Sequence, residues 1–292
     1  MMHRNKKLIL ITGPTASGKS DLAVEIALKE GSPVISCDSR QIYRELRIGT
    51  APPTPAQLLA VRHYFIFSHT VMDHYTAGRY ETEALSLLDK LFVDHDTLVM
   101  AGGSGLYVDA VCKGIDNVPP PDHQLREQLT ERLKNEGIES LRRELAILDR
   151  ESYDSIDIAN PRRILRALEV IIQTGEKYSS IKKNSDKKRG FEIERIYLEP
   201  PRDILYNRIN SRVDAMMEAG LLEEAKRLYP LRMLTALKTV GYTELFDYID
   251  GKTTLNQAVE LIKRNTRRYA KRQITWWRRE QKISVKKNSF CE

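Results

Sequence analysis

A glycine-rich phosphate loop lies near the start of the sequence. Residues 13–20 read G-P-T-A-S-G-K-S, which matches the pattern G-x-x-x-x-G-K-[ST] and directly follows an apolar run at 8–11. In such loops, backbone N–H groups and a helix N-terminus surround an anion, a lysine adds positive charge and the final hydroxyl can ligate Mg²⁺. An incidental glycine turn is the alternative. The motif predicts that a diphosphate or triphosphate binds at Gly13, Pro14, Thr15, Ala16, Ser17, Gly18, Lys19 and Ser20, with Ser20 as a Mg²⁺ ligand.

Asp38 is the acidic residue best placed to act beside this loop. Many phosphate-loop NTPases use an acid at the end of a hydrophobic strand, but here the apolar run 97–101 ends in Ala-Gly-Gly. Asp38 follows the apolar run 33–37, one helical segment after the loop. Its carboxylate could ligate Mg²⁺, accept a proton as general base or cap the following segment. Kinases, NTPases and diphosphate-releasing transferases are all compatible with these residues.

The elements that must position these residues alternate between strand-like and helix-like patterns. Helical patterns at 21–29 and 80–92 separate the three apolar runs. This alternation predicts an α/β fold, a P-loop NTPase-like parallel sheet core flanked by helices. Ligands of such sheets bind beyond the carboxyl ends of the strands, so the phosphate loop, Asp38 and Ser104 should converge.

A proline run at 118–122 interrupts the alternation and predicts a domain boundary. Charged helical patterns follow at 124–135, 138–148 and 161–174, then a lysine-rich polar segment at 182–190. The segment 191–198 alternates like a strand, and 202–281 is helical with breaks near Gly220, Pro230 and Gly251. We therefore expect a catalytic core made of 1–117 and 191–292, and a helical insertion domain at 118–190.

The 292-residue chain carries a formal net charge of +7, and the excess gathers near its C-terminal end. From 261 to 287, eleven Lys or Arg residues stand against one acid, with Tyr269, Trp276 and Trp277 among them. This pattern is typical of a surface that binds a polyanion, although a solvated helix face with inward aromatics would look the same. The three cysteines are widely spaced, which favours neither disulfides nor zinc and fits a reducing cytoplasm. No apolar stretch is long enough to span a membrane.

Six ordered motifs carry a resemblance to a known family. They are the phosphate loop, D-S-R-Q-I-Y at 38–43 with I-G-T-A-P at 48–52, G-G-S-G-L-Y at 102–107, N-P-R-R-I-L-R-A-L-E at 160–169, V-G-Y at 240–242 and K-R-Q-I-T-W at 271–276. Together they resemble the tRNA dimethylallyltransferases, also called tRNA isopentenyltransferases, of the bacterial type without a C-terminal zinc finger. The resemblance runs from Gly13 to about Arg278.

The resemblance implies transfer of a dimethylallyl group from dimethylallyl diphosphate to N6 of adenosine 37 in tRNA. The phosphate loop would then hold an isoprenoid diphosphate with Mg²⁺ in place of ATP, and Asp38 would be the general base. Ser104 stands where many relatives carry Thr and would supply a hydroxyl near the reaction. Arg212 matches an arginine that contacts the diphosphate, where an ordinary exposed helix arginine is the alternative. Pro52 departs from the Lys common in relatives.

The resemblance also implies contacts with the tRNA anticodon stem-loop, and a monomer is the plain expectation for a protein that embraces one tRNA. One of the two tryptophans is expected to pack in the core instead of stacking on a base. The implied contact residues are Asp38, Ser39, Arg40, Gln41, Arg126, Arg162, Arg163, Ile164, Leu165, Arg166, Lys238, Thr239, Val240, Gly241, Tyr242, Lys271, Arg272, Gln273, Ile274, Thr275, Trp276, Trp277 and Arg278.

Two other functions compete with this reading. A small-molecule or nucleotide kinase would place ATP in the loop and use Asp38 on a hydroxyl, which explains the first forty residues equally well. A non-catalytic RNA-binding protein with a phosphate loop would bind RNA in a nucleotide-dependent way and form no covalent product. The kinase reading does not explain the basic aromatic C-terminal segment or the Gly49-Thr50 and Gly102-Gly103 motifs.

Overall fold

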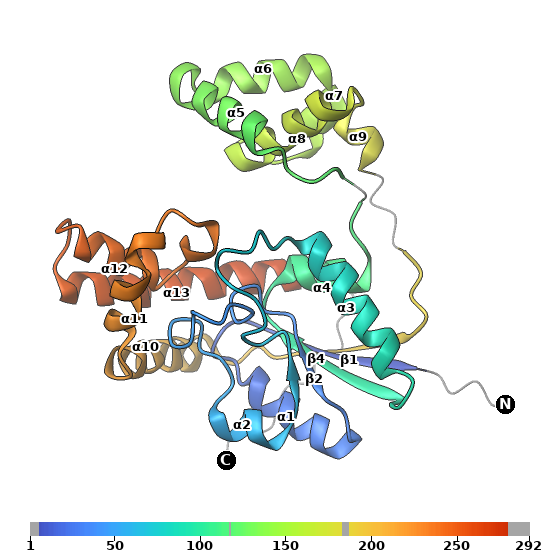
Figure 1. Ribbon diagram of the computed structural model, residues 1–292, viewed down its shortest axis with the longest axis vertical. Helices are drawn as coiled ribbons and strands as arrows, with labels where there is room; N and C mark the ends of the chain where they lie inside the picture. Colours follow the sequence, from blue (N-terminus) through green and yellow to red (C-terminus); the bar gives the residue numbers. More distant parts are fainter. Residues whose placement is uncertain (1–5, 117, 183–186, 280–292) are drawn as a thin grey trace. The chain divides into compact units, whose positions relative to one another are not determined.

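The computed structural model describes residues 6–116, 118–182 and 187–279, which fall into two units. Unit 1 consists of Met1–Cys112 and Lys188–Glu292, and unit 2 of Lys113–Lys187. Unit 1 contains a five-stranded sheet in which every pairing is parallel (Figure 1). Its strand order is β3 (His63–Tyr64), β2 (Val34–Ser36), β4 (Thr97–Gly102), β1 (Lys7–Thr12) and β5 (Glu192–Tyr197). The predicted α/β fold is confirmed, with β3 as an unpredicted edge strand.

Helices cover both faces of this sheet because the side chains of each strand alternate between faces. On one face, Ile9 and Ile11 of β1 pack in a cluster with Ala23 and Ala27 of α1 (Lys19–Glu30). On the other face, Leu8 and Leu10 share a larger core with α3 (Ala77–Leu91) and α4 (Gly105–Cys112). Figure 1 shows α1 and α3 on opposite sides of the strands. A short helix, α2 (Pro55–Ala60), precedes β3.

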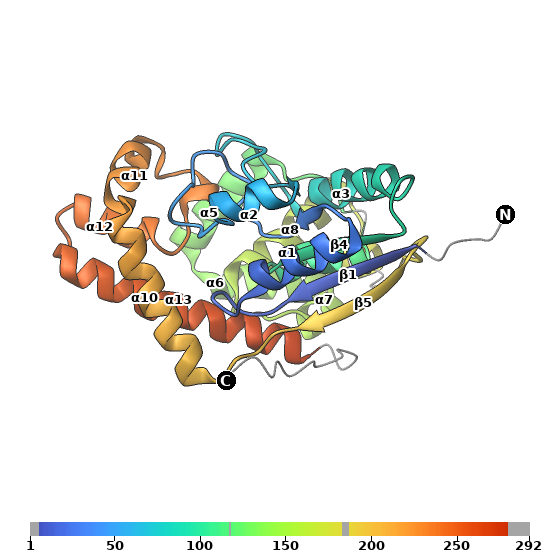
Figure 2. The same ribbon diagram turned by 90° about the horizontal axis from the view of Figure 1, so that it is seen from below.

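The helices that complete unit 1 follow β5. They are α10 (Arg202–Glu218), α11 (Leu221–Leu228), the 3₁₀ turns η1 (Tyr229–Leu231) and η2 (Thr235–Leu237), α12 (Tyr242–Ile249) and α13 (Leu255–Arg278). The predicted breaks at Gly220 and Gly251 are present, and both glycines have positive φ. Helices α10 and α13 pack side by side (Figure 2). None of the helices in the described residues is both long and apolar enough to cross a membrane.

Unit 2 is a small helical bundle with its own apolar core. Its helices are α5 (His123–Glu136), α6 (Ile138–Leu148), α7 (Arg150–Ser155), α8 (Pro161–Thr174) and α9 (Tyr178–Ile181). Leu141, Leu145 and Leu168 are fully buried at its centre. The unit begins at Lys113 and ends at Lys187, whereas the sequence suggested 118–190. The two connecting segments pair with each other, since the Lys187 N–H donates to the Lys113 carbonyl oxygen at 2.7 Å.

Candidate active site

The phosphate loop joins β1 to α1 and lies against the chain that leaves β5. Gly13 has φ +153°, and a Cβ there would lie 2.3 Å from the Leu198 carbonyl oxygen, so only glycine fits. At the other end of the loop, Lys19 begins α1. Its Nζ donates to the Pro14 carbonyl oxygen at 2.6 Å and lies 3.5 Å from Ser17 Oγ. Ser20 follows in the first turn of α1, so the loop has the geometry expected of an anion site.

Lys19 lies where three charged side chains influence one another. Burial lowers the pKa of Lys19 to about 8, the negative charge of Asp38 opposes this shift, and the nearby Arg212 adds to it. Arg212 comes from α10, and its Nη1 lies 3.4 Å from Thr15 Oγ1 in the phosphate loop. Burial also lowers the pKa of Arg212. Arg212 is therefore directed to the loop and is not an ordinary exposed helix arginine.

Asp38 lies in the turn that follows β2, and its two carboxylate oxygens differ. Oδ1 accepts backbone N–H hydrogen bonds from Arg40 at 2.8 Å and Gln41 at 3.2 Å. Within the part of the chain that the structure describes, Oδ2 accepts no hydrogen bond. The capping role considered from the sequence is thus present, and it leaves the second oxygen available to accept a proton.

Ser104 joins the end of β4 to the Asp38 turn. Its Oγ accepts the Ser39 backbone N–H at 2.9 Å and donates to Ser39 Oγ at 3.0 Å. Tyr269, on α13, lies close enough to Ser104 and Asp38 for both to influence its pKa. Burial and then the charge of Asp38 raise the pKa of Tyr269 to about 12, which keeps this phenol neutral. The expected convergence of the loop, Asp38 and Ser104 is confirmed.

Gln273 on α13 links the phosphate loop to the glycine-rich segment 102–105 at the end of β4. Its Oε1 accepts the Thr15 N–H at 2.8 Å, and its Nε2 donates to the Gly103 carbonyl oxygen at 2.9 Å. A Cβ on Gly103 would lie 2.2 Å from that Nε2, so a larger residue there would displace the Gln273 amide. Sequence reasoning assigned Gln273 to RNA and did not assign Tyr269 to the site. Their spacing of four residues, continued by the buried Trp277, would have indicated a single inward face of α13.

The predicted RNA-contact residues of unit 1 divide into exposed and buried groups. Trp277 is buried and Trp276 is 37% exposed, so the expectation that one tryptophan packs in the core is confirmed. Arg278 is exposed and pairs with Glu199 at 2.5 Å. The exposed members are Lys238, Lys271, Arg272, Thr275, Trp276 and Arg278, while Ser39, Arg40, Gln41, Thr239, Val240 and Ile274 are partly buried and Gly241 and Gln273 are buried. The basic residues from 280 onward lie outside the described residues.

Tyr242 takes a structural position instead of a surface one. It is fully buried, and its hydroxyl donates to Glu224 Oε1 at 2.7 Å. The buried Glu224 carboxylate also accepts the backbone N–H groups of residues 47–49 at 3.0 to 3.1 Å. The expected contact between the Tyr242 side chain and RNA is therefore corrected: this side chain holds the I-G-T segment in place.

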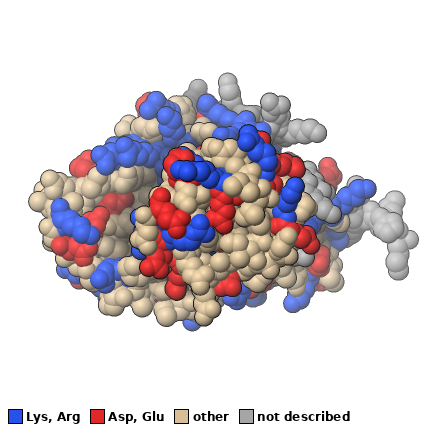
Figure 3. Space-filling model, turned by 90° about the horizontal axis from the view of Figure 1, so that it is seen from above, with Lys and Arg blue, Asp and Glu red and all other residues tan. Residues whose placement is uncertain are grey.

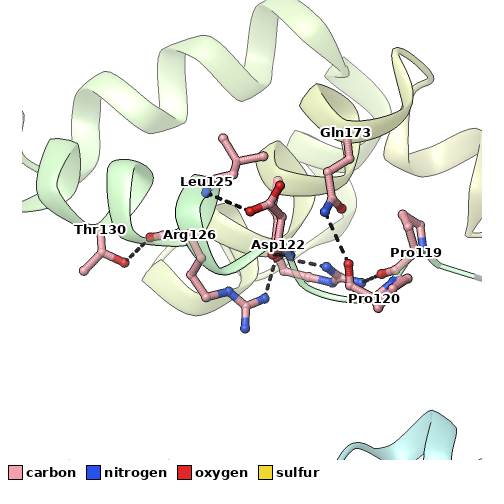
Figure 4. A network of polar contacts seen from close by, with 9 residues as sticks. Pro119, Pro120, Asp122, Leu125, Arg126, Thr130 and Gln173 are labelled. Carbon is pink, nitrogen blue, oxygen red and sulfur yellow. Dashed lines mark hydrogen bonds and ion pairs between the residues drawn. The ribbon is translucent and has the colours of Figure 1, made fainter. Parts of the chain in front are cut away.

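The RNA-contact residues predicted in unit 2 lie on α5 and α8. Arg162 and Arg163 are exposed in the first turn of α8, whereas Leu165 is partly buried. Ile164 is fully buried in the apolar core of the unit, which corrects the expectation that its side chain contacts RNA. Arg126 and Arg166 both pair with the buried Glu169, in the network that Figure 4 shows around Asp122.

Comparison with known proteins identifies the family of this chain. The family model described as IPP transferase matches residues 41–280. A tRNA dimethylallyltransferase 1 of Bacteroides fragilis is 47% identical over 278 residues, which cover 95% of this chain and 92% of the relative. Its counterpart in Phocaeicola vulgatus is 46% identical over 276 residues, covering 94% and 92%.

Solved structures support the same family. The tRNA isopentenylpyrophosphate transferase of Bacillus halodurans is 35% identical with a TM-score of 0.69, and the match covers 96% of this chain and 89% of that one. A eukaryotic dimethylallyltransferase acting on tRNA is 25% identical with a TM-score of 0.78, covering 96% and 73%. The resemblance seen in the six motifs is confirmed, and the chain is an enzyme that belongs to the IPP transferase family.

Proposed function

We propose that this chain transfers a dimethylallyl group from dimethylallyl diphosphate to N6 of adenosine 37 in the anticodon loop of tRNA. The names of its relatives support the reaction class. The observation that carries the proposal is the convergence of Lys19, Arg212 and Asp38 at the carboxyl end of the sheet. Two cations suit a leaving diphosphate, and a carboxylate with one open oxygen suits a proton acceptor.

In the proposed reaction the nitrogen of the adenine amino group attacks the allylic carbon. A carbon–nitrogen bond forms, the carbon–oxygen bond to the diphosphate breaks, and the amino proton moves to Asp38 Oδ2. Lys19, Arg212 and the loop N–H groups stabilise the charge that grows on the diphosphate. Lys19 exchanges its bond to the Pro14 carbonyl for the diphosphate. Since a base within a stacked loop cannot reach Asp38, adenosine 37 must turn out of the loop.

Mg²⁺ suits the donor set at this loop. The ion usually takes one or two protein oxygens and completes its shell with phosphate oxygens and water. Among the described residues no group of three or more His, Cys, Asp or Glu could hold a metal by itself. The Ser20 hydroxyl would therefore hold Mg²⁺ together with the diphosphate oxygens, and the ion would neutralise charge on the leaving group.

One assay tests this proposal against its rivals. The protein is incubated with unmodified tRNA, Mg²⁺ and either dimethylallyl diphosphate or ATP, and the digested nucleosides are weighed by mass spectrometry. We expect adenosine to gain one dimethylallyl unit without ATP, and a transcript with guanosine at position 37 to gain nothing. ATP turnover alone would instead indicate a kinase. Nucleotide-dependent RNA binding without a product would indicate a non-catalytic RNA-binding protein.

A further inference from the structure

Glu169 of α8 is a fully buried carboxylate shared by two arginines of unit 2. Its Oε2 accepts from Arg126 Nη2 at 2.5 Å and from Arg166 Nη1 at 2.9 Å. Its Oε1 accepts the Asp122 backbone N–H at 2.9 Å. A buried carboxylate is stable only when it is paired and hydrogen-bonded, and these three donors satisfy Glu169.

The same face of α8 fixes the segment that leads into α5. Arg166 donates to the Pro119 carbonyl oxygen, and Gln173 Nε2 donates to the Pro120 carbonyl oxygen at 3.3 Å (Figure 4). The carboxylate of Asp122 then accepts the Leu125 N–H at 3.1 Å and caps α5. Glu169 thus holds both guanidinium groups and also the start of the helix from which Arg126 projects.

The arginines keep donors that this network does not use. The side chains of Arg126 and Arg166 are 40% and 24% exposed, although the carboxylate between them is fully buried. Figure 4 shows Arg126 extending away from α5. A guanidinium group has five N–H donors in a planar fork that fits phosphate oxygens and stacks on bases. Fixing that fork before binding reduces the entropy lost on binding.

The charges on the surface are mixed. On the face that Figure 3 shows, Lys and Arg side chains are interspersed with Asp and Glu. Where the charges of a surface are mixed in this way, individually placed guanidinium groups can still supply contacts to phosphates and bases.

We propose that Glu169 is a positioning residue for tRNA: it orients Arg126 and Arg166 as a fixed pair toward the RNA. This inference rests on the proposed function, because it takes tRNA as the substrate. The alternative is that Glu169 only stabilises the fold of unit 2. If Glu169 positions the arginines, the effect of its substitution on the KM for tRNA depends on whether the arginines are present. If Glu169 only stabilises the fold, the effect is independent of them.

The test is a double-mutant cycle on the full chain. Glu169→Gln places an amide where two guanidinium groups need an anion, and Arg126→Gln removes one of those groups. We expect each variant to raise the KM for tRNA about tenfold, with kcat and the KM for dimethylallyl diphosphate within about twofold of the parent. The KM for tRNA of the double variant should be no higher than about that of the poorer single variant. Glu169→Asp, which keeps the charge, should recover part of the loss.

Glu144→Gln is the matched control, since Glu144 also pairs with an arginine of unit 2, Arg132, at 2.7 Å. It should leave the KM for tRNA unchanged. If Glu169→Gln unfolds unit 2, seen as new protease cleavage sites, Glu169→Asp replaces it in the cycle. Multiplicative effects of the two substitutions would overturn the inference, as would a normal KM for tRNA in Glu169→Gln. A normal KM in both Arg126→Gln and Arg166→Gln would instead contradict the proposed role of these arginines in tRNA binding.

Discussion

The two oxygens of the Asp38 carboxylate differ in their hydrogen bonds. Oδ1 is committed to the N–H groups of Arg40 and Gln41, and it shapes the turn that meets Ser104. Oδ2 is the oxygen that could take the adenine proton. The structural role of Oδ1 and the chemical role that we propose for Oδ2 belong to one side chain, and substitutions that differ in one oxygen can tell them apart.

Asp38→Asn keeps an amide oxygen for the two N–H groups but cannot accept a proton at neutral pH. We expect kcat to fall by about 10²- to 10⁴-fold, the usual contribution of a general base, with unchanged stability. Asp38→Ala should lose as much activity and also about 1 kcal/mol of unfolding free energy through the lost hydrogen bonds. Single-turnover rates and urea unfolding measure both effects. Near-normal turnover of Asp38→Asn would leave capping as the only role.

Lys19 should make diphosphate binding sensitive to pH. Its pKa is lowered to about 8 by burial, so the free protein carries the charged form below that pH and loses it above. We expect the KM for dimethylallyl diphosphate to rise by up to about tenfold per pH unit above 8. Rising pH weakens diphosphate binding but increases stability. Because folding disfavours the charged form of Lys19, its contribution to the unfolding free energy increases from about pH 8 to its ordinary pKa. Lys19→Met should abolish the rise in KM, and a flat profile in the parent protein would contradict the argument.

At the scale of elements, helix α13 connects loops that are far apart in the sequence. Tyr269 lies near Ser104, Gln273 joins Thr15 to Gly103, and Trp277 packs in the core. The inward face of one helix therefore determines how the ends of β1 and β4 meet.

Local signals predicted most elements, whereas contacts between distant segments were not predictable. The bounds of α8 match the expected 161–174, because Asn160 caps its start and Gly175 ends it in the left-handed region. The two-residue β3 has too short a pattern to detect, and strand order depends on pairings that no local period encodes. For the same reason Arg212 came only from the resemblance, and the bridge made by Gln273 was missed.

Gln273→Leu tests the importance of this bridge at nearly constant volume. It leaves the Thr15 N–H and the Gly103 carbonyl oxygen without their partner, so we expect a loss of about 1–3 kcal/mol in unfolding free energy. The KM for dimethylallyl diphosphate should rise because the phosphate loop loses the hydrogen bond that holds Thr15 in place. Urea unfolding followed by tryptophan fluorescence is suitable, since both tryptophans of the chain lie on α13. As a control, substitution of the exposed Glu260 on the same helix by Gln should change neither the unfolding free energy nor this KM. If Gln273→Leu also leaves both unchanged, the bridge is dispensable.

At the scale of the whole molecule, each unit presents basic residues at positions expected to contact RNA. In unit 1 they include Lys271 and Arg272 on α13, and in unit 2 Arg162 and Arg163 on α8. Exposed basic side chains beside inward aromatics fit both a polyanion surface and a merely solvated helix face. Only the response of binding to salt distinguishes the two, because counterions are released when phosphates are neutralised.

We expect tRNA affinity to fall by at least about tenfold between roughly 50 and 200 mM salt, as three or more phosphate contacts would require. Lys271→Gln and Arg272→Gln should each weaken binding and reduce the slope of log affinity against log salt by about 1. Fluorescence anisotropy of a labelled anticodon stem-loop measures both quantities. Lys226→Gln makes the same charge change on α11, where the lysine pairs with Glu223 at 2.7 Å, and should leave the slope unchanged. Equal slopes for all three variants would show that the basic face of α13 is only solvated.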